Sequence, residues 1–91
     1  MEFLFTLTGD CQEELSKDEQ KELERKGYLY EPPQEEIVKA EDINEAIKKF
    51  RLKYDLVDVV WGEYEKDTEC GEIGYSNPYN SLCLVYWIEL V

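Results

Sequence analysis

Acidic residues alternate along one stretch in the second half of the chain. Between residues 63 and 69 every second residue is a carboxylate: Glu63, Glu65, Asp67 and Glu69. In an extended strand these side chains project from one face at a spacing of ~6.6 Å. Such a row loosely imitates a nucleic-acid backbone, whose charges lie ~3.4 Å apart along each strand. The pattern therefore indicates electrostatic contact with a positively charged macromolecule.

Three other interpretations of the acidic residues stay open. Charge runs are commonly solvated faces that only keep a protein soluble. Carboxylates also bind calcium or magnesium, although the calcium-loop pattern D-x-[DN]-x-[DN]-G-x5-E does not occur in the chain. Paired carboxylates can perform acid–base or glycosidase chemistry, but any acidic protein offers such pairs. A second cluster, open to the same interpretations, consists of Glu31, Glu35, Glu36, Glu41 and Asp42.

The charge balance and the residue types exclude several functions. The chain has 22 acidic and 10 basic residues, so its net charge is −12. This charge disfavours nonspecific binding to DNA, RNA or anionic lipid. The chain has no histidine, which excludes Ser-His-Asp catalysis, Cys-His catalysis and histidine metal sites. We therefore expect a protein that is not an enzyme and that binds no cofactor or metal.

The cysteines and the apolar runs predict a cytoplasmic location. The three cysteines, Cys11, Cys70 and Cys83, are odd in number and form no CxxC motif, which favours reduced thiols in a cytosol. The longest apolar run, Leu82 to Ile88, has seven residues, whereas a membrane span needs ~20. The first residues lack the basic start and the apolar stretch of a signal peptide.

The N-terminal part of the chain predicts one strand and one helix. Residues 3–8 are aromatic, aliphatic or β-branched, which is typical of a strand. Ser16 and Glu19 form a capping box at the start of a helix over residues 16–26. Gly27 fits the left-handed position at which this helix ends.

Residues 28–40 allow two interpretations. Adjacent prolines at Pro32 and Pro33 exclude ladder pairing, so a turn is expected there. Either residues 28–31 form a short strand before that turn and a second strand follows it, or a single strand at 36–40 follows an extended loop.

The clearest helix pattern spans residues 42–54. Asp42 can cap this helix, with Glu45 three residues later. Apolar residues recur at helical spacing on one face: Ile43, Ala46, Ile47, Phe50 and Tyr54. Basic residues crowd the last turns, where the helix dipole favours cations: Lys48, Lys49, Arg51 and Lys53.

Two further strands complete the predicted elements. Residues 56–65 and 81–90 are expected to pair as an antiparallel ribbon, joined by a loop over residues 66–80. The order β-α-β(β)-α-β-β predicts the α+β class, a two-layer sandwich with two helices on one face of a mostly antiparallel four- or five-stranded sheet. With both strands around the proline turn, the order matches a ferredoxin-like variant. We expect a single domain over residues 1–91.

The predicted sheet carries apolar residues on both of its faces. Two short helices can cover only one face of such a sheet. The other face, with Trp61 and Trp87, would then form an apolar patch large enough to mark an interaction site. Three covers are open: the loop over residues 66–80 with Tyr75 and Tyr79, a second copy of the chain, or a different partner.

These observations favour a non-enzymatic binding protein that inhibits a basic, nucleic-acid-handling partner by mimicry or occlusion. Small acidic proteins of this kind include anti-CRISPR and anti-restriction inhibitors of phages and immunity proteins against nuclease toxins; the likeness rests on size and charge alone. The alternative is a homodimeric accessory domain whose acidity serves only solubility. We expect no direct contact with nucleic acid or membrane. The predicted partner-binding residues are Glu35, Glu36, Trp61, Glu63, Glu65, Asp67, Glu69, Glu72 and Trp87.

Overall fold

The computed structural model describes residues 1–10, 14–28, 31–56, 59–65, 70–76 and 83–91. The elements within these ranges are β1 (Glu2–Asp10), α1 (Lys17–Lys26), β2 (Glu35–Lys39), α2 (Ile43–Lys53), β3 (Val59–Glu65), β4 (Cys70–Ser76) and β5 (Cys83–Leu90). The strands form one antiparallel sheet in the order β2-β1-β5-β4-β3, five strands among the described residues. The predicted α+β class is therefore confirmed.

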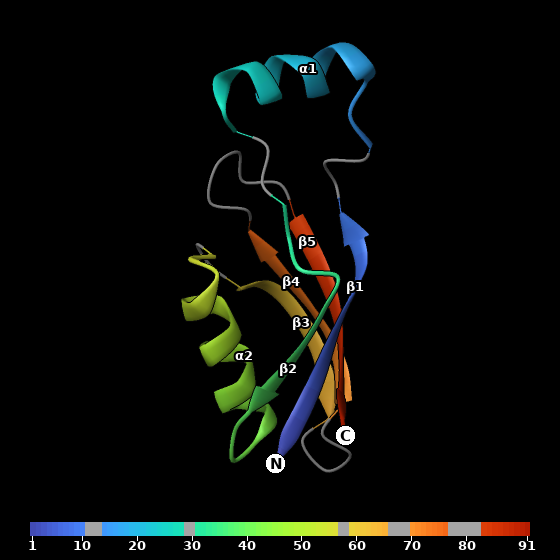
Figure 1. Cartoon of the computed structure of the whole chain (residues 1–91). Coiled ribbons are helices and arrows are strands. Elements are labelled where there is room, and N and C mark those ends of the chain that lie inside the picture. Colours follow the sequence, from blue (N-terminus) through green and yellow to red (C-terminus); the bar gives the residue numbers. More distant parts are fainter. Residues whose placement is uncertain (11–13, 29–30, 57–58, 66–69, 77–82) are drawn as a thin grey trace.

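The two helices lie in different places relative to the sheet. Figure 1 shows α2 against one face of the sheet and α1 beyond the ends of β1 and β5. None of the residues of α1 is buried, whereas α2 buries Ile43, Ala46, Ile47 and Phe50. Of the two described helices, α2 alone therefore covers the sheet, although the sequence placed both helices on one face.

Strand β4 occupies part of the chain that the sequence assigned to a loop over residues 66–80. It pairs with β3 on one side and with β5 on the other, so those two strands are not neighbours. The prediction of a ribbon between them was wrong. Gly71 and Gly74 suggested turns, but Ile73 and Tyr75, the residues on either side of Gly74, are fully buried. Burial in the middle of the sheet outweighs the weak strand propensity of glycine.

The connection of the first two strands differs from a ferredoxin-like fold. Strands β1 and β2 are antiparallel neighbours joined through α1, whereas a ferredoxin-like βαβ unit joins parallel strands. The strand β2 lies between the prolines and α2, as both interpretations expect. Tyr28 and Glu31 lie outside any strand, and residues 29–30 lie outside the described residues.

The predicted helix caps are confirmed. The backbone N–H of Glu19 donates to Ser16 Oγ over 3.2 Å, and Gly27 ends α1 in the left-handed region with φ 75°. The N–H of Glu45 donates to Asp42 Oδ1 over 2.8 Å at the start of α2. Local capping thus forms both helices, and only the apolar stripe of α2 attaches a helix to the sheet.

An aromatic cluster joins α2 to the sheet. The Phe50 ring stacks on Phe5 with centroids 4.4 Å apart and planes 4° from parallel, and it meets Tyr86 edge-on at 4.7 Å. The Tyr75 hydroxyl donates to the Ile47 carbonyl over 3.0 Å. Burial raises the pKa of Tyr75 far above its ordinary value, so this hydroxyl keeps its proton. We call the face that carries this cluster the inner face.

Truncating the centre of this cluster should remove much of the stability. Phe50→Ala is expected to cost about 3–5 kcal/mol, a large share of the about 5–15 kcal/mol typical of a domain. Leu52→Ala is the matched control, because Leu52 lies in the same helix and is 58% exposed. Urea unfolding followed by circular dichroism compares the two variants. Similar losses for both would show that the cluster does not anchor α2.

Candidate functional site

The face of the sheet opposite α2, here called the outer face, has a mixed surface. Side chains alternate between the two faces of a strand, and the intervening residues Phe5, Ile73 and Tyr86 are fully buried on the inner face. The described strands place these residues on the outer face: Glu2, Leu4, Thr6, Glu35, Ile37, Lys39, Glu72, Val85, Trp87 and Glu89. Carboxylates thus stand among apolar side chains, whereas the sequence led us to expect a second apolar face.

One row of cross-strand partners crosses the whole sheet. Thr6 pairs with Glu35 on one side and with Trp87 on the other. Trp87 in turn pairs with Glu72, and Glu72 pairs with Glu63. We call these five residues the outer row. Directly paired side chains on one face have Cβ atoms about 4.5–5.5 Å apart, so Trp87 has a carboxylate beside it.

Four side chains of the outer row, those of β1, β2, β4 and β5, have a described exposure, and among these Glu35 and Trp87 are the exposed ones. Glu35 is exposed and Trp87 retains 38% of its surface, while Glu72 and Thr6 are half-buried. A tryptophan this exposed offers a ring face to a partner.

Positive and negative charges lie in different layers of the described fold. The strands contain eight acidic residues and one basic residue, whereas α2 contains four basic residues and one acidic residue. The basic residue, Lys39, lies on the outer face with its Nζ 4.0 Å from a Glu2 carboxylate oxygen. The described residues of the outer face include four acidic side chains, those of Glu2, Glu35, Glu72 and Glu89, and one basic side chain, so this face is acidic. The cations of α2 lie across the sheet, on the side that this helix covers (Figure 1).

The sheet brings together several of the residues predicted to bind a partner. Three of them lie on the outer face: Glu35, Glu72 and Trp87. Three more occupy alternate positions of β3, in register with Gly74, Glu72 and Cys70 respectively: Trp61, Glu63 and Glu65. Asp67 and Glu69 lie outside the described residues.

Glu36 does not share the outer face, although the sequence grouped it with Glu35. Its side chain bonds to α2, accepting from Lys53 Nζ and, over 2.6 Å, from the Tyr54 hydroxyl. The hydrogen bond from Lys53 and then that from Tyr54 lower the pKa of the Glu36 carboxyl. Burial is the main reason that the pKa of Tyr54 is raised. Adjacent residues of a strand point to opposite faces, so Glu36 holds the helix while Glu35 faces outward.

Two outer-face residues were missed in the sequence. Glu89 lies two residues after Trp87, and Ile37, two residues after Glu35, is 53% exposed. The two-residue period of a strand would have found both. Only the apolar residues of the last strand were considered in the sequence, so Glu89 was not placed on the outer face.

The predicted loop over residues 66–80 does not cover the outer face in its described part, residues 70–76. Tyr75 lies in β4 and is buried on the inner face against α2. Tyr79 lies outside the described residues. Among the described residues, no helix or strand packs on the outer face.

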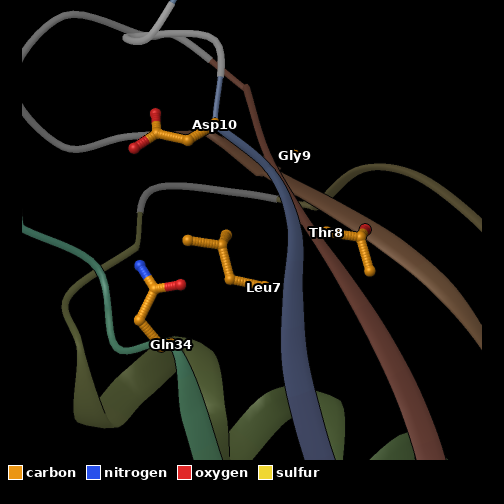
Figure 2. A pocket seen from close by; sticks show the side chains of 5 residues that line it. All are labelled: Leu7, Thr8, Gly9, Asp10 and Gln34. Atoms are coloured by element: carbon orange, nitrogen blue, oxygen red, sulfur yellow. The ribbon is translucent and has the colours of Figure 1, made fainter.

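A small pocket lies where β1 leaves β2. The pairing of β1 with β5 shifts between Leu7 and Gly9, and the N–H of Leu7 donates to the Gln34 carbonyl over 2.9 Å. Figure 2 shows Leu7, Asp10 and Gln34 on one side of β1 and Thr8 on the other. The pocket measures about 150 Å³, below the ~300 Å³ at which pockets for small organic ligands begin. Among the described residues that line it, Asp10 is the one carboxylate, so those residues form no catalytic pair.

The described part of the chain has neither a metal-binding cluster nor a membrane-spanning helix. No group of three or more His, Cys, Asp or Glu side chains there could hold a metal ion. No helix within those ranges has the length and apolar character to cross a membrane. Cys70 and Cys83 are thiols and not disulfides, both half-buried.

Comparison with known proteins identifies no relative. No protein-family model, curated protein or solved structure matches the chain. A function must therefore be argued from the outer face and its charges.

The contact of Glu36 with α2 should make stability depend on pH in the acid range. A carboxyl whose pKa is lowered on folding stabilises the protein fully above its ordinary value of 4.5, and less as the pH falls through the folded-state pKa. Glu36→Gln should therefore lower the urea midpoint at neutral pH, by an amount that shrinks as the pH falls below 4.5. Glu35→Gln, one residue away on the outer face, is the matched control and should change stability by less than about 0.5 kcal/mol. A pH-independent loss for Glu36→Gln would contradict the assignment.

Proposed function

We propose that this chain is a non-enzymatic binding protein whose outer face occupies a basic, nucleic-acid-binding surface of another protein. It would act as an inhibitor of the anti-CRISPR, anti-restriction or nuclease-immunity type. The observation that supports this proposal is the outer row, in which the exposed Trp87 lies beside Glu72 on a face whose described residues include four acidic side chains and one basic side chain. Because the basic residues of α2 lie on the opposite side of the sheet, the negative potential is concentrated on the outer face.

The residues of the outer row suit a partner rich in arginine. An arginine guanidinium can stack on an exposed tryptophan ring while it donates to a neighbouring carboxylate. Trp87 and Glu72 are direct cross-strand partners, which is the spacing that such a double contact needs. Charge-assisted hydrogen bonds of this kind are about twice as strong as neutral ones.

Long-range electrostatic attraction should raise the rate at which the partner associates. A net charge of −12, with α2 holding its cations on the other side, orients the acidic face towards a basic groove. Such steering raises association rates and weakens as salt screens it. The partner would then lose access to nucleic acid by occlusion. Thiols in place of disulfides suit a cytoplasmic site of action.

Charge reversal at two places separates a directed surface from simple acidity. Glu72→Lys with Glu89→Lys reverses the outer face, and Asp18→Lys with Glu24→Lys makes the same change in net charge on α1. Immobilised protein is incubated with nuclease-treated cell lysate, and the captured proteins are identified by mass spectrometry. We expect the wild type and the α1 variant to capture basic nucleic-acid-binding proteins and the outer-face variant to lose them.

A competition experiment tests the mechanism on the captured proteins. Duplex DNA or RNA should displace them, and 0.5 M salt should release them, because both act on the same basic surface. Equal capture by the two double variants would reject the outer face as the contact. Capture of proteins that nucleic acid does not displace would reject the mimicry.

A further inference from the structure

Strand β2 is one edge of the sheet, and no described residue forms a ladder with its far side. Backbone bonds to β1 flank both of its ends: Leu7 N–H donates to the Gln34 carbonyl and Ala40 N–H to the Met1 carbonyl, each over 2.9 Å. In an antiparallel pair, hydrogen-bonded and non-bonded residue pairs alternate. The alternation therefore turns the backbone groups of the odd-numbered residues of β2 towards the open edge.

These odd-numbered residues are an acid, an apolar residue and a base: Glu35, Ile37 and Lys39. A contact with α2 supports their assignment to the edge, because Lys49 Nζ donates to the Lys39 carbonyl over 3.0 Å. Ile37 is a large apolar residue at the centre of this edge strand, and its side chain is 53% exposed. The edge thus offers backbone donors and acceptors, with a negative charge at one end and a positive charge at the other.

We propose that a second copy of this chain pairs its β2 with this edge, antiparallel and centred on Ile37. In that register Ile37 faces Ile37 of the other copy, and Glu35 faces Lys39 of the other copy at both ends. Opposite charges in direct cross-strand positions attract. The facing residues have the outward backbone groups that a ladder requires, and the Lys39 carbonyl, which accepts from Lys49 Nζ, has a second lone pair for the new bond. The two sheets join into one continuous sheet.

Neighbouring registers are unfavourable, which makes this one specific. A shift of two residues in one direction places Glu35 opposite Glu41, and the shift in the other direction places Lys39 opposite Pro33, which has no N–H to donate. Short, charged edge strands normally resist pairing. Here the two charges differ in sign and stand symmetrically about Ile37, so an antiparallel copy matches them.

The edge suits a second copy better than the outer face does. Stacking two outer faces would bury carboxylates such as Glu72 against one another without partners, which is strongly unfavourable. Pairing through β2 leaves both outer faces on the same side and open. The dimer is therefore independent of the proposed function.

Overall repulsion limits the strength of this dimer. Each copy carries a net charge of −12, and the repulsion is screened beyond about 8 Å at 0.15 M salt. The contact is also small, because β2 has five residues. We therefore expect a reversible dimer that dissociates on dilution.

Complementary charge variants test the register. Glu35→Lys alone and Lys39→Glu alone each place like charges opposite one another, and each should weaken dimerisation at least about tenfold in sedimentation equilibrium. An equimolar mixture of the two single variants should associate as a heterodimer. The double variant Glu35→Lys with Lys39→Glu should recover the wild-type dissociation constant. Circular dichroism verifies that every variant is folded.

A proline variant tests the edge itself. Ile37→Pro removes an N–H that points away from β1, so it should abolish the dimer and leave the fold intact, while Ile37→Val should retain the dimer. Four results would overturn the proposal: a wild type that stays monomeric at ~0.5 mM, single charge variants that dimerise as well as the wild type, a mixture that does not associate, or a dimer that survives Ile37→Pro.

Discussion

The packing of Phe50 between the aromatic side chains of the sheet is the contact on which the remaining features depend. Phe50 stacks on Phe5 of β1 and meets Tyr86 of β5 edge-on, and so it joins strands that are distant in the sequence. It assigns one face of the sheet to α2. In the described pairing of β1, β2, β4 and β5, side chains such as Thr6, Glu35, Glu72 and Trp87 are then directed away from the helix.

This single covered face explains how an acidic chain becomes an acidic surface. The basic residues of α2 flank its buried stripe on the inner side, while the carboxylates of the strands that face outward remain in solvent. Glu35 and Glu36 show the effect most clearly. These residues are adjacent in β2, yet the Glu35 carboxylate is exposed while the Glu36 carboxylate accepts hydrogen bonds from Lys53 and Tyr54.

The outer face and the open edge of β2 share the side chains of Glu35, Ile37 and Lys39 but offer different chemistry. The face combines carboxylates with the half-exposed Trp87, which suits a basic partner. The edge combines outward backbone groups, which form no ladder with a described strand, with two opposite charges around Ile37, which suits the same strand in the opposite direction. A dimer through the edge would place two acidic faces side by side and double the area available to a basic partner.

Local patterns in the sequence determined both helices and most strands, because caps and apolar spacing act between residues that are close in the chain. Ser16, Asp42 and the stripe around Phe50 were interpreted correctly for this reason. The place of β4, the order of the strands and the separate roles of Glu35 and Glu36 were decided only by the tertiary structure. Those features depend on pairing between segments that are distant in the sequence. Residues 70–76 contain glycines that locally predict turns, but burial between β3 and β5 makes them a strand.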